Sequence, residues 1–69
     1  MDQIRTGSLI RKLRLKMGLT QKELAERINV SDKAVSKWES GASAPSTTNL
    51  MALANLFDVE AEELLKEAK

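Results

Sequence analysis

The chain has 69 residues, a net charge of +1, 42% hydrophobic residues and 30% charged residues. A chain of this length buries only about 60% of its unfolded surface, which leaves no room for a large ligand cavity. Because it contains neither cysteine nor histidine, a disulfide scaffold, the usual zinc ligands and a histidine proton shuttle are excluded. We therefore expect one domain over residues 1–69, with a core of about 6–65, that needs no metal and no cofactor.

Charge and hydropathy are distributed unevenly along the chain. Residues 1–40 carry nine Lys or Arg and five Asp or Glu, a net charge of +4, whereas residues 41–69 carry two and five, a net charge of −3. A charge run is usually only a solvated helix face, but a basic half is also what a nucleic-acid-binding domain requires. The longest uninterrupted apolar run, Leu50 to Ala54, is far too short to cross a membrane, and no apolar leader opens the chain. The expected location is the cytoplasm.

The first predicted helix runs from about Ile4 or Thr6 to Met17 and is closed by Gly18. Its buried face should consist of Ile10, Leu13 and Met17. Its outer face should carry Arg11, Lys12 and Lys16, which either contact phosphates or only solubilise the helix. Arg14 follows directly on the core residue Leu13, so its guanidinium needs a partner near the interior, and Glu39 is the candidate; the alternative is a solvated arginine.

The stretch from Thr20 to Gly41 predicts two short helices joined by a tight turn. Thr20 and Glu23 have the spacing of a capping box, so the second helix begins at about Gln21. Asn29 is the non-glycine residue best suited to a positive φ at its end, and Ser31 can cap the third helix, about Asp32 to Ser40. The apolar positions of the two helices, which should share one core, are Leu24, Ala25, Ile28, Val35 and Trp38. A turn this short forces a steep crossing, with Ala25 expected at the closest approach.

Two further helices complete the expected all-α fold of five helices. The fourth is capped by Ser46 or Thr47 after an extended Pro45 segment. Its core stripe should consist of Leu50, Leu53, Ala54 and Phe57. The fifth, about Glu60 to Glu67, should bury Leu64 and Leu65.

These residues together resemble the phage-repressor and Cro helix-turn-helix family, also called the xenobiotic-response-element family, from about Thr6 to Leu65. The resemblance is carried by Arg14, Gly18-Leu19-Thr20-Gln21, Glu23-Leu24-Ala25, Val30-Ser31, Val35-Ser36-Lys37-Trp38-Glu39, Gly41, Pro45, Leu50, Leu53-Ala54, Val59 and Leu64-Leu65. It implies a compact five-helix domain whose third helix lies in the major groove of double-stranded DNA, usually as a dimer on a palindromic operator.

The expected DNA-reading positions follow from helix geometry. Four polar residues of the third helix face away from Val35 and Trp38 and should meet base edges: Asp32, Lys33, Ser36 and Lys37. Asp32 is equally an ordinary acid in the first turn of a helix. Trp38 could stack on a base, but its spacing from Val35 assigns it to the core. Gln21, at the start of the second helix, should point its amide outward toward a phosphate. The further positions assigned to phosphates are Lys22, Ser31, Ser43, Ser46, Thr47 and Lys16.

Three departures from the family pattern concern anchoring and assembly. Ala42 and Ala44 stand where many relatives have Lys or Arg, which predicts weaker electrostatic binding. Asp58 replaces a common glycine, so a left-handed residue there would cost about 1 kcal/mol or more. Glu60 replaces the usual cap of the fifth helix. Since the resemblance places a homodimer contact near the fifth helix, monomer and dimer both stay open.

The sequence therefore favours a sequence-specific transcriptional regulator, more specifically a repressor, that binds DNA. The alternative is an antitoxin or another protein-interaction module whose acidic half engages a partner. An enzyme is disfavoured, because the sequence has no histidine or cysteine and no phosphate-cradling glycine loop, and its carboxylates are spaced as helix-surface charges.

Overall fold

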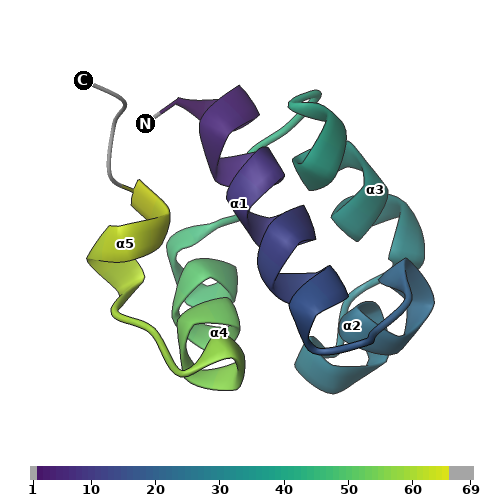
Figure 1. The fold of residues 1–69 in the computed structure, drawn as a ribbon. Helices are drawn as coiled ribbons and strands as arrows, with labels where there is room; N and C mark the ends of the chain where they lie inside the picture. Colours follow the sequence, from purple (N-terminus) through teal and green to yellow (C-terminus); the bar gives the residue numbers. More distant parts are fainter. Residues whose placement is uncertain (1, 66–69) are drawn as a thin grey trace.

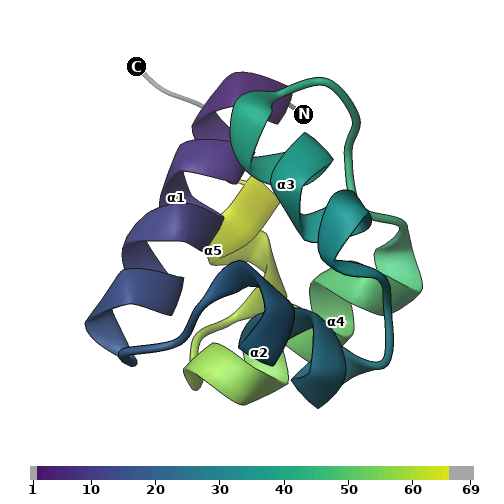
Figure 2. The same ribbon diagram turned by 90° about the vertical axis from the view of Figure 1, so that its right-hand side faces the viewer.

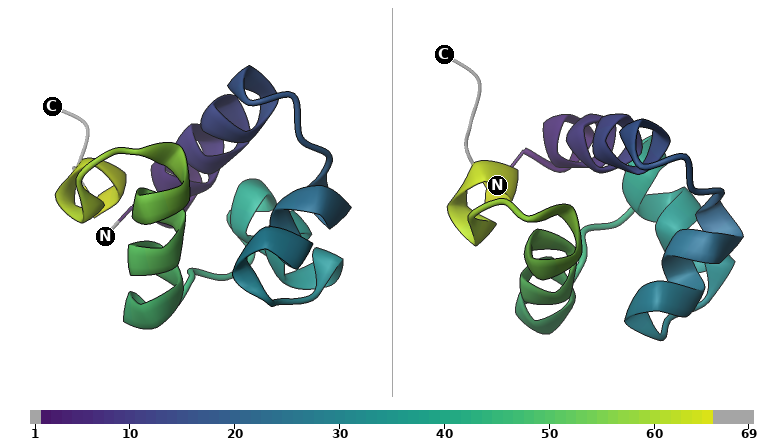
Figure 3. Two further views of the ribbon diagram at one scale, coloured as in Figure 1. Left: turned by 90° about the horizontal axis from the view of Figure 1, so that it is seen from below. Right: turned by 60° about the horizontal axis from the view of Figure 1, so that its bottom comes forward.

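The computed structural model describes residues 2–65, which form five helices. They are α1 (Gln3–Lys16), α2 (Gln21–Ile28), α3 (Asp32–Ser40), α4 (Thr47–Phe57) and α5 (Ala61–Leu65). Helix α1 crosses the molecule, with α2 and α3 on one side and α4 and α5 on the other (Figures 1 and 3). The expected five-helix, all-α architecture is thus confirmed. In this part of the chain, no helix is both long enough and apolar enough to span a bilayer.

The buried apolar side chains form one cluster to which every helix contributes. Its members are Ile10, Leu19, Leu24, Ala25, Val35, Trp38, Leu50, Leu53, Ala54 and Leu64. Three residues expected in the core pack against this cluster while staying partly exposed: Leu13, Ile28 and Phe57. The helix-turn-helix therefore rests on a core supplied by all of the surrounding helices.

The expectation that Met17 is buried is wrong, because its side chain is 43% exposed. Helix α1 ends at Lys16, Met17 is its C-cap, and the chain then reverses through Gly18 at a φ of +74°. The reversal carries Met17 off the buried stripe and brings Leu19, only 9% exposed, into the core. A periodic pattern cannot foresee this exchange, since periodicity stops where the helix stops.

The ends of α1 and α5 also differ from the sequence expectations. Asp2 caps α1 by accepting a hydrogen bond from the Arg5 N–H at 3.1 Å, so the helix starts at Gln3. Helix α5 begins at Ala61 rather than Glu60. Its expected last residue, Glu67, and the side chain of Leu65 lie outside the described part of the chain. Leu64 is buried as predicted.

A buried hydrogen bond ties α5 to α1. The Thr6 hydroxyl donates to the Leu64 carbonyl oxygen at 2.8 Å. The connection before α5 passes through Asp58, whose φ of +58° is left-handed. Asp58 stands where the family pattern commonly has glycine. The structure adopts the strained left-handed conformation there with an aspartate.

The second helix starts with the predicted capping box. The Thr20 hydroxyl accepts from the Glu23 N–H at 3.0 Å, and the Glu23 carboxylate accepts from the Thr20 N–H at 2.9 Å. The hydrogen bond from the Thr20 backbone is the main cause of a Glu23 pKa below its ordinary value. This reciprocal pair fixes where α2 begins and how the chain enters it.

Helices α1 and α3 approach closely at Gly7. A Cβ atom at this position would overlap the Trp38 carbonyl oxygen and lie 3.1 Å from the Glu39 Cα. Both obstacles are backbone, so a side chain at residue 7 would push α3 away from α1. Glycine is therefore required here for packing, although it weakens a helix.

We predict that Gly7→Ala lowers the free energy of unfolding by up to about 2 kcal/mol, because an overpacking cost of about 3 kcal/mol against backbone outweighs the roughly 1 kcal/mol gain in helix propensity. Urea unfolding measures the change. Ser8→Ala, at the exposed neighbouring position of α1, is the control and should be neutral or slightly stabilising. A Gly7→Ala protein as stable as the control would contradict the close approach.

We also predict a pH-dependent contribution from Glu23. Its folded pKa is lowered, so the folded state binds fewer protons there than the unfolded state, and the stabilisation is present at neutral pH. It is lost as the pH falls through the folded pKa. In unfolding measurements, Glu23→Gln should be less stable than the wild type at neutral pH and should approach it in acid. Glu26→Gln, at an exposed glutamate of the same helix, is the control, and equal behaviour of the two variants would refute the assignment.

Candidate nucleic-acid interface

The turn between α2 and α3 is built as the sequence predicted. Asn29 is left-handed, with φ 63° and ψ 45°, and its N–H donates to the Ala25 carbonyl oxygen. The Val30 N–H donates to the same oxygen at 2.9 Å. The Ser31 hydroxyl then accepts from the Ala34 N–H at 3.2 Å and starts α3. Ala25 is only 2% exposed beneath this turn. The two helices are thus held at one fixed angle.

The outer face of α3 is a continuous polar stripe. All four residues expected there are exposed: Asp32, Lys33, Ser36 and Lys37. On the opposite side of the helix, Val35 is fully buried and Trp38 is 4% exposed. Trp38 is therefore a core residue, as predicted. Figure 2 shows α3 and α2 together, flanked by α1 and α4. The stripe is presented on a helix whose inner face is locked into the core.

The predicted ion pair between Arg14 and Glu39 is present and buried. The Arg14 Nε lies 2.6 Å from Glu39 Oε2, and its Nη2 donates to Glu39 Oε1 at 3.0 Å. The Arg14 Nη1 donates to the Leu19 carbonyl oxygen at 2.7 Å, a contact that the sequence did not reveal. The hydrogen bonds with Glu39 raise the already high pKa of Arg14 further. The pair connects the end of α1 to the end of α3.

Gln21 requires a correction. Its side chain was expected to point its amide outward, but it is half-buried and its Nε2 donates to Glu39 Oε1 at 3.1 Å. The physical reason is that the first residue of α2 lies beside the last turn of α3, where the buried Glu39 carboxylate offers a stronger acceptor than water. One N–H of Gln21 is thus committed inside the protein.

The other positions assigned to phosphates differ in their exposure. Lys16, Lys22, Ser31, Ser46 and Thr47 are exposed, whereas Ser43 is half-buried. The Ser31 and Ser46 hydroxyls each accept a capping hydrogen bond, the latter from the Asn49 N–H at 3.2 Å. Each of these hydroxyl oxygens thus accepts a hydrogen bond from the backbone of its own helix, while its O–H group can still donate to an anion.

The chain after α3 is held by a hydrogen bond from α1, which the sequence did not predict. Gly41, at a φ of +80°, ends α3, and its carbonyl oxygen accepts from Gln3 Nε2 at 3.3 Å. The following residues, including Ala42 and Ala44, carry no charge. The first turn of α1 thus supports the corner that brings the chain to α4, and no periodic signal in the sequence marks that contact.

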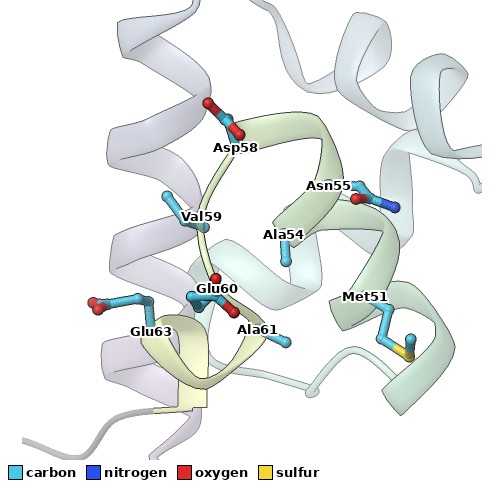
Figure 4. A pocket seen from close by; sticks show the side chains of 8 residues that line it. All are labelled: Met51, Ala54, Asn55, Asp58, Val59, Glu60, Ala61 and Glu63. Carbon is cyan, nitrogen blue, oxygen red and sulfur yellow. The ribbon is translucent and has the colours of Figure 1, made fainter.

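A groove lies between α4 and α5, away from the α3 stripe. It measures about 620 Å³ and is lined by Met51, Ala54, Asn55, Asp58, Val59, Glu60, Ala61 and Glu63 (Figure 4). Met51 is 60% exposed at its edge. The groove combines apolar side chains with carboxylates. Within residues 2–65, no cluster of potential metal ligands is found.

Several known proteins with similar sequences are named as transcriptional regulators. The HTH-type transcriptional activator BcrR from Enterococcus faecalis is 43% identical over 56 residues, which cover 81% of this chain and 28% of the activator. The chain spans less than half the length of the curated relatives that it matches.

Solved structures of similar sequence share the fold. The c2 repressor of Salmonella phage P22, solved in complex with a synthetic operator, superposes with a TM-score of 0.85 at 34% identity, covering 88% of this chain and 92% of that chain. The restriction-modification controller protein C.AhdI from Aeromonas hydrophila gives 0.83 at 33% identity, covering 91% and 96%. A helix-turn-helix family model matches residues 10–64. The chain therefore belongs to the helix-turn-helix family of Cro and the phage repressors.

Proposed function

We propose that this protein is a sequence-specific transcriptional regulator, more specifically a repressor, that inserts α3 into the major groove of double-stranded DNA. The observation that carries the proposal is the exposed stripe of α3, whose inner face is fixed by buried Val35 and Trp38. A rigid helix with donors and acceptors on its outer face is suited to direct readout of base edges. The P22 c2 repressor, of similar fold, was solved with an operator. The role requires only binding, without catalysis, and would be carried out in the cytoplasm.

Each residue of the stripe offers a different chemistry to the groove. Lys33 and Lys37 donate to O6 and N7 of guanine, and Asp32 accepts from the N4 amine of cytosine. Ser36 can serve as donor or acceptor. A good base contact of this kind discriminates by about 1 to 3 kcal/mol. Guanine–cytosine pairs should therefore dominate the half-site.

The phosphate contacts position α3 without reading sequence. At the N-terminus of α2, the backbone N–H groups of Gln21 and Lys22 have no acceptor within the helix and suit a phosphate oxygen. Lys16 and the hydroxyls of Ser31, Ser43, Ser46 and Thr47 add further contacts. Because the loop at Ala42 and Ala44 is uncharged, the electrostatic contribution to binding is small, and a single domain binds weakly.

A homodimer through the α5 region would compensate for this weakness. Two copies would place two α3 helices in successive major grooves, about 34 Å apart on a palindromic operator. The groove at α4 and α5 supports this arrangement, because it combines the exposed Met51 with apolar surface on the side away from the reading stripe. Its carboxylates also make it a poor surface for DNA.

Selection of bound sequences from random duplexes tests the proposed function. We expect an inverted repeat with guanine–cytosine pairs in each half, and a featureless enrichment at moderate salt would refute sequence-specific binding. Co-purification of a stoichiometric protein partner in place of DNA would favour an interaction module instead.

Two substitutions separate reading from anchoring in the same assay. Lys37→Ala should relax the preference at one base position by about 1 to 3 kcal/mol. Lys16→Ala should weaken all sequences alike and reduce the slope of log K against log salt by about one. An unchanged sequence preference in Lys37→Ala would remove this residue from the reading stripe.

The proposed dimer predicts the effect of a charge in the groove. Met51→Asp should weaken self-association by about tenfold or more, because it would bury an unpaired charge in an apolar contact. Analytical ultracentrifugation over a concentration series measures this change. Met17→Asp is the matched control. Met17 is also an exposed methionine, but it caps the C-terminal end of α1 and does not line the groove, so this substitution should leave association unchanged. Equal association of both variants and the wild type would place any dimer elsewhere.

A further inference from the structure

One carboxylate joins the three helices that surround the reading site. Glu39 Oε1 accepts from Arg14 Nη2 at 3.0 Å and from Gln21 Nε2 at 3.1 Å, while Oε2 lies 2.6 Å from Arg14 Nε. The side chains of Arg14 and Glu39 are only 9% and 5% exposed. In the described part of the chain, no buried side-chain polar atom lacks a hydrogen-bond partner. The buried polar atoms of Arg14, Gln21 and Glu39 therefore all have hydrogen-bond partners.

The network decides how the Gln21 carboxamide is oriented. An ionised carboxylate can only accept hydrogen bonds, so the group of Gln21 that faces Glu39 must be its NH2 and not its carbonyl oxygen. A flipped amide would place two acceptors 3.1 Å apart. One N–H is thereby fixed, and the second N–H and the carbonyl oxygen take defined positions at the N-terminus of α2. A free glutamine side chain would sample many rotamers at this surface.

We propose that Glu39 is a positioning residue for DNA binding: held by Arg14, it presets the Gln21 carboxamide so that its second N–H meets a phosphate oxygen beside the N-terminus of α2. The inference rests on the proposed function, since it assigns how one phosphate contact of that function is prepared. Glu39 itself touches no DNA. Its contribution is to remove the loss of side-chain freedom that Gln21 would otherwise suffer on binding.

Arg14 has a second task in this arrangement. A lone carboxylate at hydrogen-bond distance from the amide that receives a phosphate would repel the phosphate. The bidentate guanidinium neutralises Glu39 at 2.6 and 3.0 Å and keeps both of its oxygens in place. Arg14 thus fixes the position of the Glu39 carboxylate and also neutralises its charge.

The first test uses the free wild-type protein. The chain contains two glutamines, Gln3 and Gln21, so their side-chain NH2 signals are readily assigned by NMR. Relaxation of the Gln21 side-chain nitrogen should give an order parameter of about 0.85, the value of a rigid backbone. The exposed Asn29 carboxamide, outside the groove, serves as the internal control and should fall below about 0.6. A mobile Gln21 carboxamide in the folded, unbound protein would overturn the proposal.

The second test removes both charges of the pair together. Arg14→Met/Glu39→Met keeps the net charge and the approximate volume, and paired apolar replacement of a buried ion pair is often tolerated where a single replacement is not. Thermal unfolding would first establish that the variant is folded. It should then bind the selected operator and a random duplex each about fivefold to tenfold more weakly. Binding equal to that of the wild type would show that the pair serves stability alone.

A double-mutant cycle with Gln21→Ala isolates the coupling. In the wild-type background, Gln21→Ala should weaken binding about tenfold. In the paired methionine background, it should cost less than about twofold, because the carboxamide is no longer preset. Equal losses in both backgrounds would show that Gln21 acts independently of Glu39. If the wild type binds no duplex, the proposed function fails, whereas a rigid Gln21 signal would still establish the network.

Discussion

The buried pair of Arg14 and Glu39 is the constraint that connects α1 to α3 and on which the proposed reading stripe depends. Each partner would pay a large desolvation cost alone, and the pair is tolerated because every inward-facing hydrogen-bonding group of the network finds a partner. Separating the partners would leave each charge buried and uncompensated, so α1 and α3 must keep an arrangement in which the two side chains meet. Gln21 extends the same constraint to α2. One carboxylate thus links α1, α2 and α3.

Backbone conformation supplies the second constraint. Asn29 and Gly41 are left-handed at the two ends of the α3 region, so the chain enters and leaves that helix along fixed directions. Gly7 then allows α1 to approach the α3 backbone, and Gln3 reaches the Gly41 carbonyl oxygen. Together these contacts hold α3 from behind and at its end. Its exposed stripe can therefore face a groove without rearranging.

The sequence predicted those features that depend on neighbouring residues. The capping box and the burial of Trp38 follow from spacings of three positions, and the left-handed Asn29 follows from the residue type at the end of α2. Glu39 was also found as the partner of Arg14, because a buried arginine demands a carboxylate. The orientation of Gln21 was missed, because an uncharged polar residue in the first turn of a helix does not by itself require a buried partner, whereas an arginine near the core does. Met17 was missed because α1 ends one residue earlier, and the Gly7 approach because it depends on how two helices pack.

The two halves of the domain carry opposite net charges. The half with a net charge of +4 contains α1, α2 and α3, and the half with −3 contains α4 and α5. In the field of a DNA duplex, the first half is attracted and the second repelled, so encounters are biased toward the reading stripe. The overall attraction stays small at a net charge of +1, which limits binding to arbitrary sequences. Under the proposed function, discrimination then depends more on the base contacts of α3 than on charge, and a second copy adds affinity without adding indiscriminate attraction.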